Sequence, residues 1–164
     1  MKLFESAALL LLLHAMAHAQ PYPSKPIRLI IPFPAGGPVD VTLRLISPKA
    51  SEALGQNIVI ENRAGASSII GSEIVARSAP DGYTVLIGTV SNTINTSLIA
   101  KMPFDITRDF EAGGQLLITP SILTAHPTLP VKSVKEVIAL ARARPGQLTY
   151  GSAGNGTPSH LAGE

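Results

Sequence analysis

An apolar segment followed by a glycine turn and a helix start constrains the fold of this chain most strongly. Residues 27–31 are apolar almost throughout, which is typical of a parallel strand buried on both faces of a sheet. Gly36 and Gly37 then allow a close approach of backbone or ligand, and Pro38 suits the first position of a helix. The sequence therefore predicts a strand, a tight turn and a helix whose free N–H groups attract anions.

The predicted helix begins at Pro38 or Val39 and should reach about residue 54, where Gly55 ends it. Pro48 lies inside this helix, and proline removes one helical hydrogen bond, so we expect a kink or a break near residues 46–48. The inner face is predicted to consist of apolar residues at roughly helical spacing, namely Val41, Leu45, Ile46 and Leu54.

The same order of strand, turn and helix then repeats along the chain. Strands are expected at 57–62 and 84–88, and a helix at 69–78 lies between them, capped by Ser67 or Ser68. Such an alternation within a short length of chain predicts an α/β fold of mostly parallel βαβ units with right-handed crossovers.

The remainder of the chain carries one strong helix signal and several weaker strand signals. Ser133 and Glu136 form a capping box, which predicts a helix that runs to about residue 144. Another helix should open at Pro158, and a short one should follow the polar loop 89–95. Further strands are expected at 115–119, 121–126 and 148–150.

The first residues have the pattern of an export signal. The apolar run 7–13 is too short to span a membrane, which takes about 20 residues. Ala17-His18-Ala19 supplies the small residues that precede a cleavage site, so we expect a mature chain that starts at Gln20. The sequence contains no cysteine, which excludes disulfides, thiolate metal sites and a lipid anchor on cysteine.

Loops rich in glycine or small polar residues mark the candidate binding site. The loops 35–40, 89–95 and 152–157 each lead into a helix start, and ligands of open α/β sheets bind at the carboxyl ends of the strands. Neutral hydrogen-bonding groups for a carboxylate are available from Ser91, Asn95, Ser152, Asn155 and Thr157. Asp40 is better suited to complement the positive helix N-terminus than to contact an anion.

Phosphate-binding motifs are incomplete in the glycine-rich loop near the end of the sequence. Gly151 and Gly156 have the spacing of a P-loop, but Thr157-Pro158 stands where that motif requires lysine followed by serine or threonine. Ser159 occupies the third glycine position of a dinucleotide fingerprint. We therefore expect no nucleotide cofactor.

Catalytic and metal motifs are also missing. Ser91 and Ser152 lack the G-x-S-x-G context of a nucleophilic serine, and His126 and His160 stand isolated, so we predict no catalytic residue, no metal and no cofactor. The formal net charge of +2 is scattered along the sequence, which argues against a nucleic-acid partner. An α/β enzyme domain that binds a phosphate-bearing substrate remains an alternative.

Several motifs in order resemble the Bug family, the periplasmic solute-binding proteins of tripartite tricarboxylate transport systems. The opening motif is Pro26-Ile27-Arg28 leading to Pro32-Phe33-Pro34-Ala35-Gly36-Gly37-Pro38-Val39-Asp40. The likeness continues at 54–56, 61–63, 79–84, 88–89, 103–105, 109–110, 129–133, 145–148, 152–157 and 160–164. It covers essentially the whole mature chain.

This resemblance implies an α/β, periplasmic-binding-protein-like (type II, Venus flytrap) fold, in which two lobes hold a ligand carboxylate between them. It implies a small carboxylate ligand, membrane permease subunits as partners, a monomeric state, a periplasmic location and no enzymatic activity. Carried over residue by residue, it nominates the ligand-binding residues Ala35, Gly37, Asp40, Thr89, Ser91, Asn95, Ser152, Asn155, Gly156 and Thr157.

The sequence, at 164 residues, has roughly half the length that this resemblance implies, so we expect a truncated two-lobe fold. The expected divisions are a signal peptide at 1–19, a first lobe at 20–120 without its return segment, and the start of a second lobe at 121–164. We expect the isolated polypeptide to be poorly stable and to bind weakly or not at all. An inactive truncated gene product is a further alternative.

Overall fold

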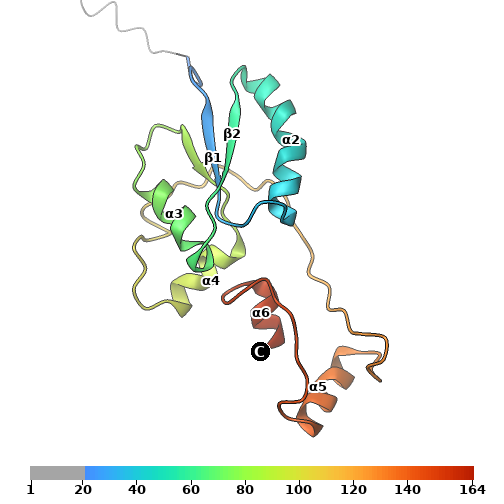
Figure 1. The fold of residues 1–164 in the computed structure, drawn as a ribbon. Coiled ribbons are helices and arrows are strands. Elements are labelled where there is room, and N and C mark those ends of the chain that lie inside the picture. Colours follow the sequence, from blue (N-terminus) through green and yellow to red (C-terminus); the bar gives the residue numbers. More distant parts are fainter. Residues whose placement is uncertain (1–20) are drawn as a thin grey trace, which may run out of the picture.

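A computed structural model describes residues 21–164, and its centre is a small parallel sheet (Figure 1). The strands are β1 (Ile27–Ile31), β2 (Ile58–Asn62) and β3 (Thr84–Leu86), in the order β2-β1-β3. Leu29 on β1 lies opposite Ile60 on one side and Val85 on the other. The expected parallel α/β arrangement is confirmed, whereas the predicted signal peptide lies outside the described residues.

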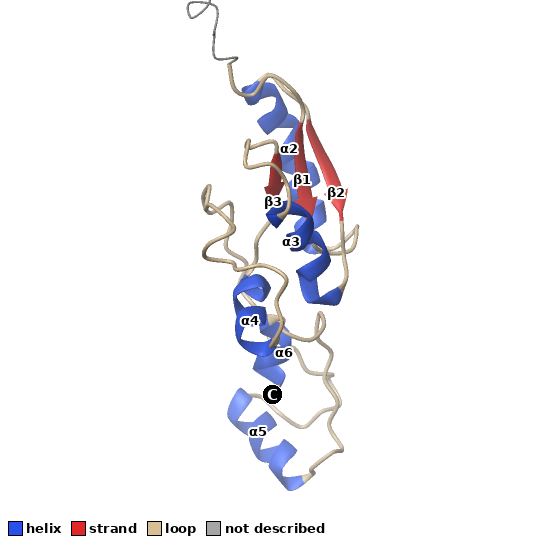
Figure 2. Cartoon of the chain, turned by 90° about the vertical axis from the view of Figure 1, so that its left-hand side faces the viewer, coloured by secondary structure: helices blue, strands red, loops and turns tan. Residues whose placement is uncertain are grey.

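Helices cover both faces of this sheet. Figure 2 shows α2 (Pro38–Leu54) behind the strands and α3 (Ile69–Ala76) in front of them. Leu43 of α2 is 2% exposed and packs in the core with Leu29 and Ile31. On the other face, Gly71 of α3 lies so close to Pro32 that an added Cβ would stand 2.9 Å from the proline Cβ. Each crossover therefore covers its own side of β1.

The structure corrects the expected inner face of α2. Val41, Leu45, Ile46 and Leu54 are between 41% and 75% exposed, while Leu43 is buried and Val39 packs against the core. The helix carries apolar residues on both sides, so helical spacing alone cannot select the face that meets the sheet. The expected break at Pro48 is also wrong, because α2 continues unbroken from Pro38 to Leu54 and the proline lies on its exposed side.

The segment between β2 and α3 adopts an unexpected backbone conformation. Ala66, Ser67 and Ser68 form a short 3-10 turn, η1 (Ala66–Ser68), with φ angles of 45°, 54° and 78°. Ser68 takes the N-cap position of α3, but its side chain does not cap the helix. Ser68 therefore occupies the expected cap position without making the expected hydrogen bond.

The predicted helices beyond β3 are present, whereas the predicted strands are not, and residues 90–95, expected as a loop, already belong to a helix. The helices are α4 (Val90–Leu98), α5 (Val134–Ala143) and α6 (Pro158–Gly163). The ranges 115–119, 121–126 and 148–150 contain no strand, and no described segment pairs with them. Ile118 is 80% and Ile122 is 82% exposed. These residues have strand-like composition, but a strand forms only where a neighbour accepts and donates its backbone hydrogen bonds.

The capping box at α5 is confirmed in a modified form. The Ser133 side chain accepts a hydrogen bond from the Glu136 N–H at 3.3 Å, and the Glu136 carboxylate accepts from the Lys132 N–H at 2.6 Å. The returning bond thus reaches one residue further back than in a standard capping box. Among the helices of residues 21–164, none is both long and apolar enough to cross a membrane.

Candidate functional site

The carboxyl edge of the sheet brings two of the predicted site loops together. β1 and β3 are adjacent and parallel, so the loops that follow them leave from the same edge. The Ile87 N–H donates to the Ile30 carbonyl at 2.9 Å, which extends this pairing to the end of β3. The loop before α6 approaches the same region, where Figures 1 and 2 both show α6 beside α4.

The loop between β1 and α2 is closed by the Asp40 carboxylate. Asp40 is 3% exposed, and its Oδ2 accepts a hydrogen bond from the Gly36 N–H at 2.8 Å. Arg44 Nε donates to both carboxylate oxygens at 3.0 Å. The hydrogen bond from Arg44, followed by the one from Gly36, lowers the pKa of Asp40 to about 2. This ionised, neutralised carboxylate supports the expected role of Asp40 in holding the helix start.

Two backbone donors remain open at the start of α2. Among the described residues, no acceptor receives the N–H groups of Val39 and Asp40, and the Gly37 N–H makes only a 3.4 Å contact with the Pro34 carbonyl. Ala35 is exposed and Gly37 is half-buried next to them. Free N–H groups at a helix N-terminus carry partial positive charge, so this corner of the sheet edge is suited to an anion.

The start of α4 is built by an asparagine that the sequence analysis did not single out. Asn92 Oδ1 accepts from the Thr89 N–H at 2.8 Å, and its Nδ2 donates to Ser72 Oγ at 2.7 Å and to Ser68 Oγ at 3.3 Å. Thr89 and Asn92 together form a capping box. A T-x-x-N pattern is a weaker form of the S/T-x-x-E/Q signature, so position 92 carried a recognisable local signal.

Ser91 stands beside this cap with its hydroxyl uncommitted. The residue is 4% exposed, and among the described residues no group forms a hydrogen bond with its Oγ. The Oγ atom is not among the fully buried polar atoms that lack a partner, so it still reaches solvent. The Ser91 hydroxyl is therefore available for a ligand.

The Asn95 side chain, unlike that of Ser91, is hydrogen-bonded within the fold. This residue is 1% exposed, and its Nδ2 donates to the Ser67 carbonyl in the left-handed turn after β2. Its Oδ1 faces Gly156, where an added Cβ would overlap it. The Asn95 amide thus joins the loops that precede α3 and α6. The left-handed turn was not foreseen, because alanine and serine give no sequence signal for a positive φ.

The loop before α6 divides into an exposed and a buried part. Ser152 and Asn155 are exposed, whereas Gly156 and Thr157 are buried. Thr157 Oγ1 donates to the Gly154 carbonyl at 2.7 Å, and the same oxygen accepts from the His160 N–H at 3.3 Å as the cap of α6. Thr157 therefore shapes its own loop, whereas Asn155 offers a free amide to solvent and the exposed Ser152 Oγ accepts from the Gly154 N–H at 3.3 Å.

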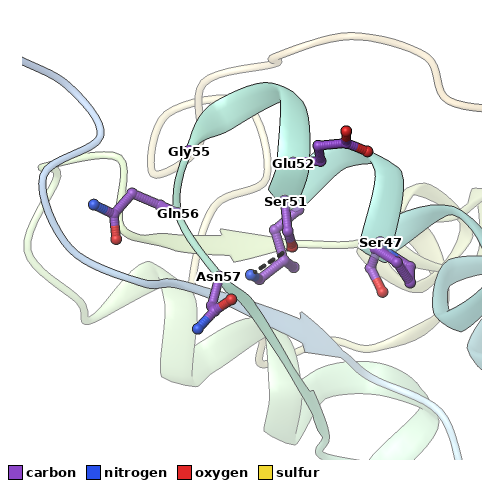
Figure 3. Close-up of a pocket in the computed structure, with 8 residues that line it drawn as sticks. Ser47, Ser51, Glu52, Gly55, Gln56 and Asn57 are labelled. Carbon is purple, nitrogen blue, oxygen red and sulfur yellow. Dashed lines mark hydrogen bonds between the residues drawn. The ribbon is translucent and has the colours of Figure 1, made fainter.

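The hollows on the surface lie away from these loops. Figure 3 shows one at the end of α2, lined by Ser47, Ser51, Glu52, Gly55, Gln56 and Asn57. There Ser51 Oγ accepts from the Ile58 N–H at 3.0 Å, so this hollow lies at the amino end of β2, opposite the candidate edge. A second hollow is lined by residues that lie between positions 96 and 109. Neither contains a predicted site residue, and no group of residues in 21–164 is arranged to hold a metal ion.

Comparisons with known proteins agree with this architecture. Residues 42–164 match a family described as the tripartite tricarboxylate transporter family receptor (TctC). A UPF0065 protein from the tcbD-tcbE intergenic region of Pseudomonas sp. (strain P51) is 39% identical over 141 residues, which cover 86% of this chain and 42% of that protein. Protein BugT of Bordetella pertussis is 36% identical over 152 residues, covering 92% of this chain and 47% of BugT. The chain thus spans less than half the length of these relatives.

Solved structures of related proteins are also similar to this chain. Rpa4515 of R. palustris, solved with adipate, superposes with a TM-score of 0.67 at 37% identity, covering 87% of this chain and 48% of that one. The periplasmic binding protein BugD has a TM-score of 0.67 at 28% identity, with the same coverage. MatC of Rhodopseudomonas palustris, solved with malate, has a TM-score of 0.52 at 34% identity and covers 54% of this chain and 31% of its own.

Proposed function

Because the chain belongs to the TctC family of tripartite tricarboxylate transporter receptors, we propose that it captures a small carboxylate-bearing ligand in the periplasm for a membrane permease. The observation that carries this proposal is the group of open donors at the carboxyl edge of the sheet. The free N–H groups of Val39 and Asp40 lie at the end of β1, and the uncommitted Ser91 hydroxyl lies after the adjacent β3. Together they suit an anion that lacks a full cationic partner.

The ligand class follows from the relatives. Two structural neighbours, Rpa4515 and MatC, hold adipate and malate, both dicarboxylates. One carboxylate of such a ligand would accept from the start of α2 and from Ser91. The exposed groups of Ser152 and Asn155 are within the loop that flanks this edge, and they are our candidates for contacts with the rest of the ligand.

The proposed organisation has two lobes and an exported location. Residues 20–120 would form the first lobe, which includes the sheet, and residues 121–164 would begin the second. The alternation of buried strands and covering helices ends by residue 104, which supports a boundary in the extended segment that follows. Removal of residues 1–19 on export, monomeric behaviour and contact with permease subunits belong to the same proposal, because family receptors deliver solute to a transporter.

Ligand binding is tested by thermal unfolding of the chain with adipate and with malate. A ligand that binds only the folded state stabilises it by about 2.7 kcal/mol when its concentration is about a hundredfold above Kd. Dimethyl adipate is the matched control, since it keeps the chain length but has no carboxylate. Because the isolated chain is expected to bind weakly at best, the ligand is added in large excess, and the result that supports the proposal is a higher Tm with at least one dicarboxylate and no change with the diester.

Variants and a second anion separate the alternatives. Ser91→Ala should weaken the effect of the dicarboxylate, whereas Ser97→Ala, on an exposed position of the same helix, should not. Stabilisation by inorganic phosphate without any response to the dicarboxylates would favour the phosphate-binding enzyme domain. A Tm that responds to no carboxylate would contradict the proposal that this chain holds the site.

A further inference from the structure

The C-terminal part of the chain is seated on the sheet domain through very few residues. After Phe104, the described residues include only two buried ones, Gly156 and Thr157. α5 and α6 contain no buried residue. Both buried residues lie in the loop before α6, which Figure 2 shows next to α4. Burial is therefore concentrated at one small contact between two parts of the chain.

This contact has no room for a side chain. A Cβ on Gly156 would overlap Oδ1 of Asn95 and would stand 3.6 Å from Cδ1 of Leu98. Gly156 also has a φ of 73°, in the left-handed region that favours glycine. The glycine thus permits both the backbone conformation of the loop and its close approach to α4.

Asn95 connects this contact to the rest of the sheet edge. Its Oδ1 forms the surface against which Gly156 packs, while its Nδ2 donates to the Ser67 carbonyl. The hydrogen bond holds the amide plane, so the oxygen has a fixed position. Ser68, the next residue, accepts from Asn92 in the cap of α4. The left-handed turn, α4 and the loop before α6 therefore meet at Asn95.

We propose that Asn95 and Gly156 form the joint that seats the C-terminal segment over the carboxyl edge of the sheet, and that Asn95 is a positioning residue and not a ligand contact. The close approach of Gly156 sets how far residues 152–155 extend over the edge. Any group added at this joint holds the loop away from α4. This inference goes beyond the proposed function, because the contact between Asn95 and Gly156 involves protein atoms alone.

The test is a distance measurement on the ligand-free chain. The sequence has no cysteine, so spin labels on Lys49→Cys in α2 and Ala162→Cys in α6 are unique, and both positions are exposed. With an intact joint we expect a single narrow distance distribution between the labels. Gly156→Ala should broaden or lengthen this distribution. Gly151→Ala is the control in the same loop, since nothing lies within 4 Å of its added Cβ, and it should leave the distribution narrow.

Two further variants separate the contact with Asn95 from the backbone conformation of Gly156. Asn95→Gln lengthens the amide toward Gly156 and should broaden the distribution without changing the glycine. In Asn95→Ala the overlapping oxygen is gone, so adding Gly156→Ala to that background should cause less broadening than Gly156→Ala causes alone. Thermal unfolding by circular dichroism identifies any variant that fails to fold, and Asn95→Gln still tests the joint if Gly156→Ala does not fold.

The proposal is overturned by a broad distribution in the labelled parent, because the segment would then not be seated. Unchanged distributions in both Gly156→Ala and Asn95→Gln would also overturn it. Equal broadening by Gly156→Ala in the parent and in the Asn95→Ala background would overturn it as well. The left-handed φ of residue 156 would then account for the effect without any contact with Asn95. The measurement uses no ligand, so failure of carboxylate binding leaves its result intact.

Discussion

Replacing Asn92 by aspartate should destabilise the chain in a pH-dependent way. The side chain is 3% exposed, accepts from the Thr89 N–H and donates to the hydroxyls of Ser72 and Ser68. Asn92→Asp keeps the shape and the acceptor, but it removes both donated hydrogen bonds. Ser72 cannot simply donate in return, because its hydroxyl already donates to the Ser68 carbonyl at 2.9 Å.

The magnitude follows from these contacts. Losing two hydrogen bonds costs about 2 kcal/mol at roughly 1 kcal/mol each while the carboxyl is ionised, and the protonated carboxyl can restore one of them because its O–H donates. Burial disfavours the ionised carboxyl, which raises its folded pKa above the unfolded value of about 3.9. Each unit of this rise adds about 1.4 kcal/mol of destabilisation at neutral pH. The first turn of α4 favours negative charge by only about 0.3–1 kcal/mol, which is too little to offset burial.

The loss of stability caused by Asn92→Asp should therefore increase with pH. A group with a raised folded pKa loses stability as pH rises, so the difference in unfolding free energy between Asn92→Asp and the parent should be smallest near about pH 4 and larger near about pH 7.5. Urea unfolding monitored by circular dichroism at both pH values measures it. Thr93→Asp is the matched control, because it adds the same charge to an exposed position of the same helix turn. A loss for Asn92→Asp that does not increase with pH, or one equal to that of the control, would refute this reasoning.

Two further predictions concern the sheet domain. Hydrogen bonds from arginine side chains lower the pKa values of Asp40 and Glu61 to about 2, so the stability that they contribute is present above the unfolded pKa of about 4 and is lost as pH falls toward 2. The urea midpoint should fall in this window, and less steeply in Asp40→Asn; an equal slope would contradict the assignment. Leu43→Ala should cost about 2–5 kcal/mol because Leu43 is 2% exposed, whereas Leu45→Ala, at 75% exposure, should change stability by less than about 0.5 kcal/mol. Similar losses in both variants would show that the face of α2 is misassigned.

Local patterns account for most of what could be predicted. The strand Ile27–Ile31, the helix start at Pro38 and its end at Gly55 follow from residues adjacent in sequence, and all are present in the structure. The same is true of the α5 cap at Ser133 and of Pro158 at the start of α6. Capping and turn chemistry act over a few residues, so a single sequence is sufficient to identify them.

Features that depend on distant residues could not be predicted in this way. The buried face of α2 was assigned wrongly because both of its sides are apolar, and only contact with the sheet selects Leu43. The segment 115–126 has the composition of strands but no neighbour to pair with among the described residues. Whether a residue forms a strand or a core contact depends on what lies opposite it, and this information is not local.

The sequence alone determined the parallel α/β class, the loops at the carboxyl edge and the family resemblance, because each is carried by short motifs in a fixed order. Only the tertiary structure decided the roles of the polar residues at that edge. Asp40 is neutralised by Arg44, and Asn95 is held between Ser67 and Gly156, while the Ser91 hydroxyl is left free. A polar side chain has a limited number of donors and acceptors. One whose groups are already paired within the fold therefore has few hydrogen bonds to offer a ligand. The identity of its partner is set by packing between segments far apart in the chain.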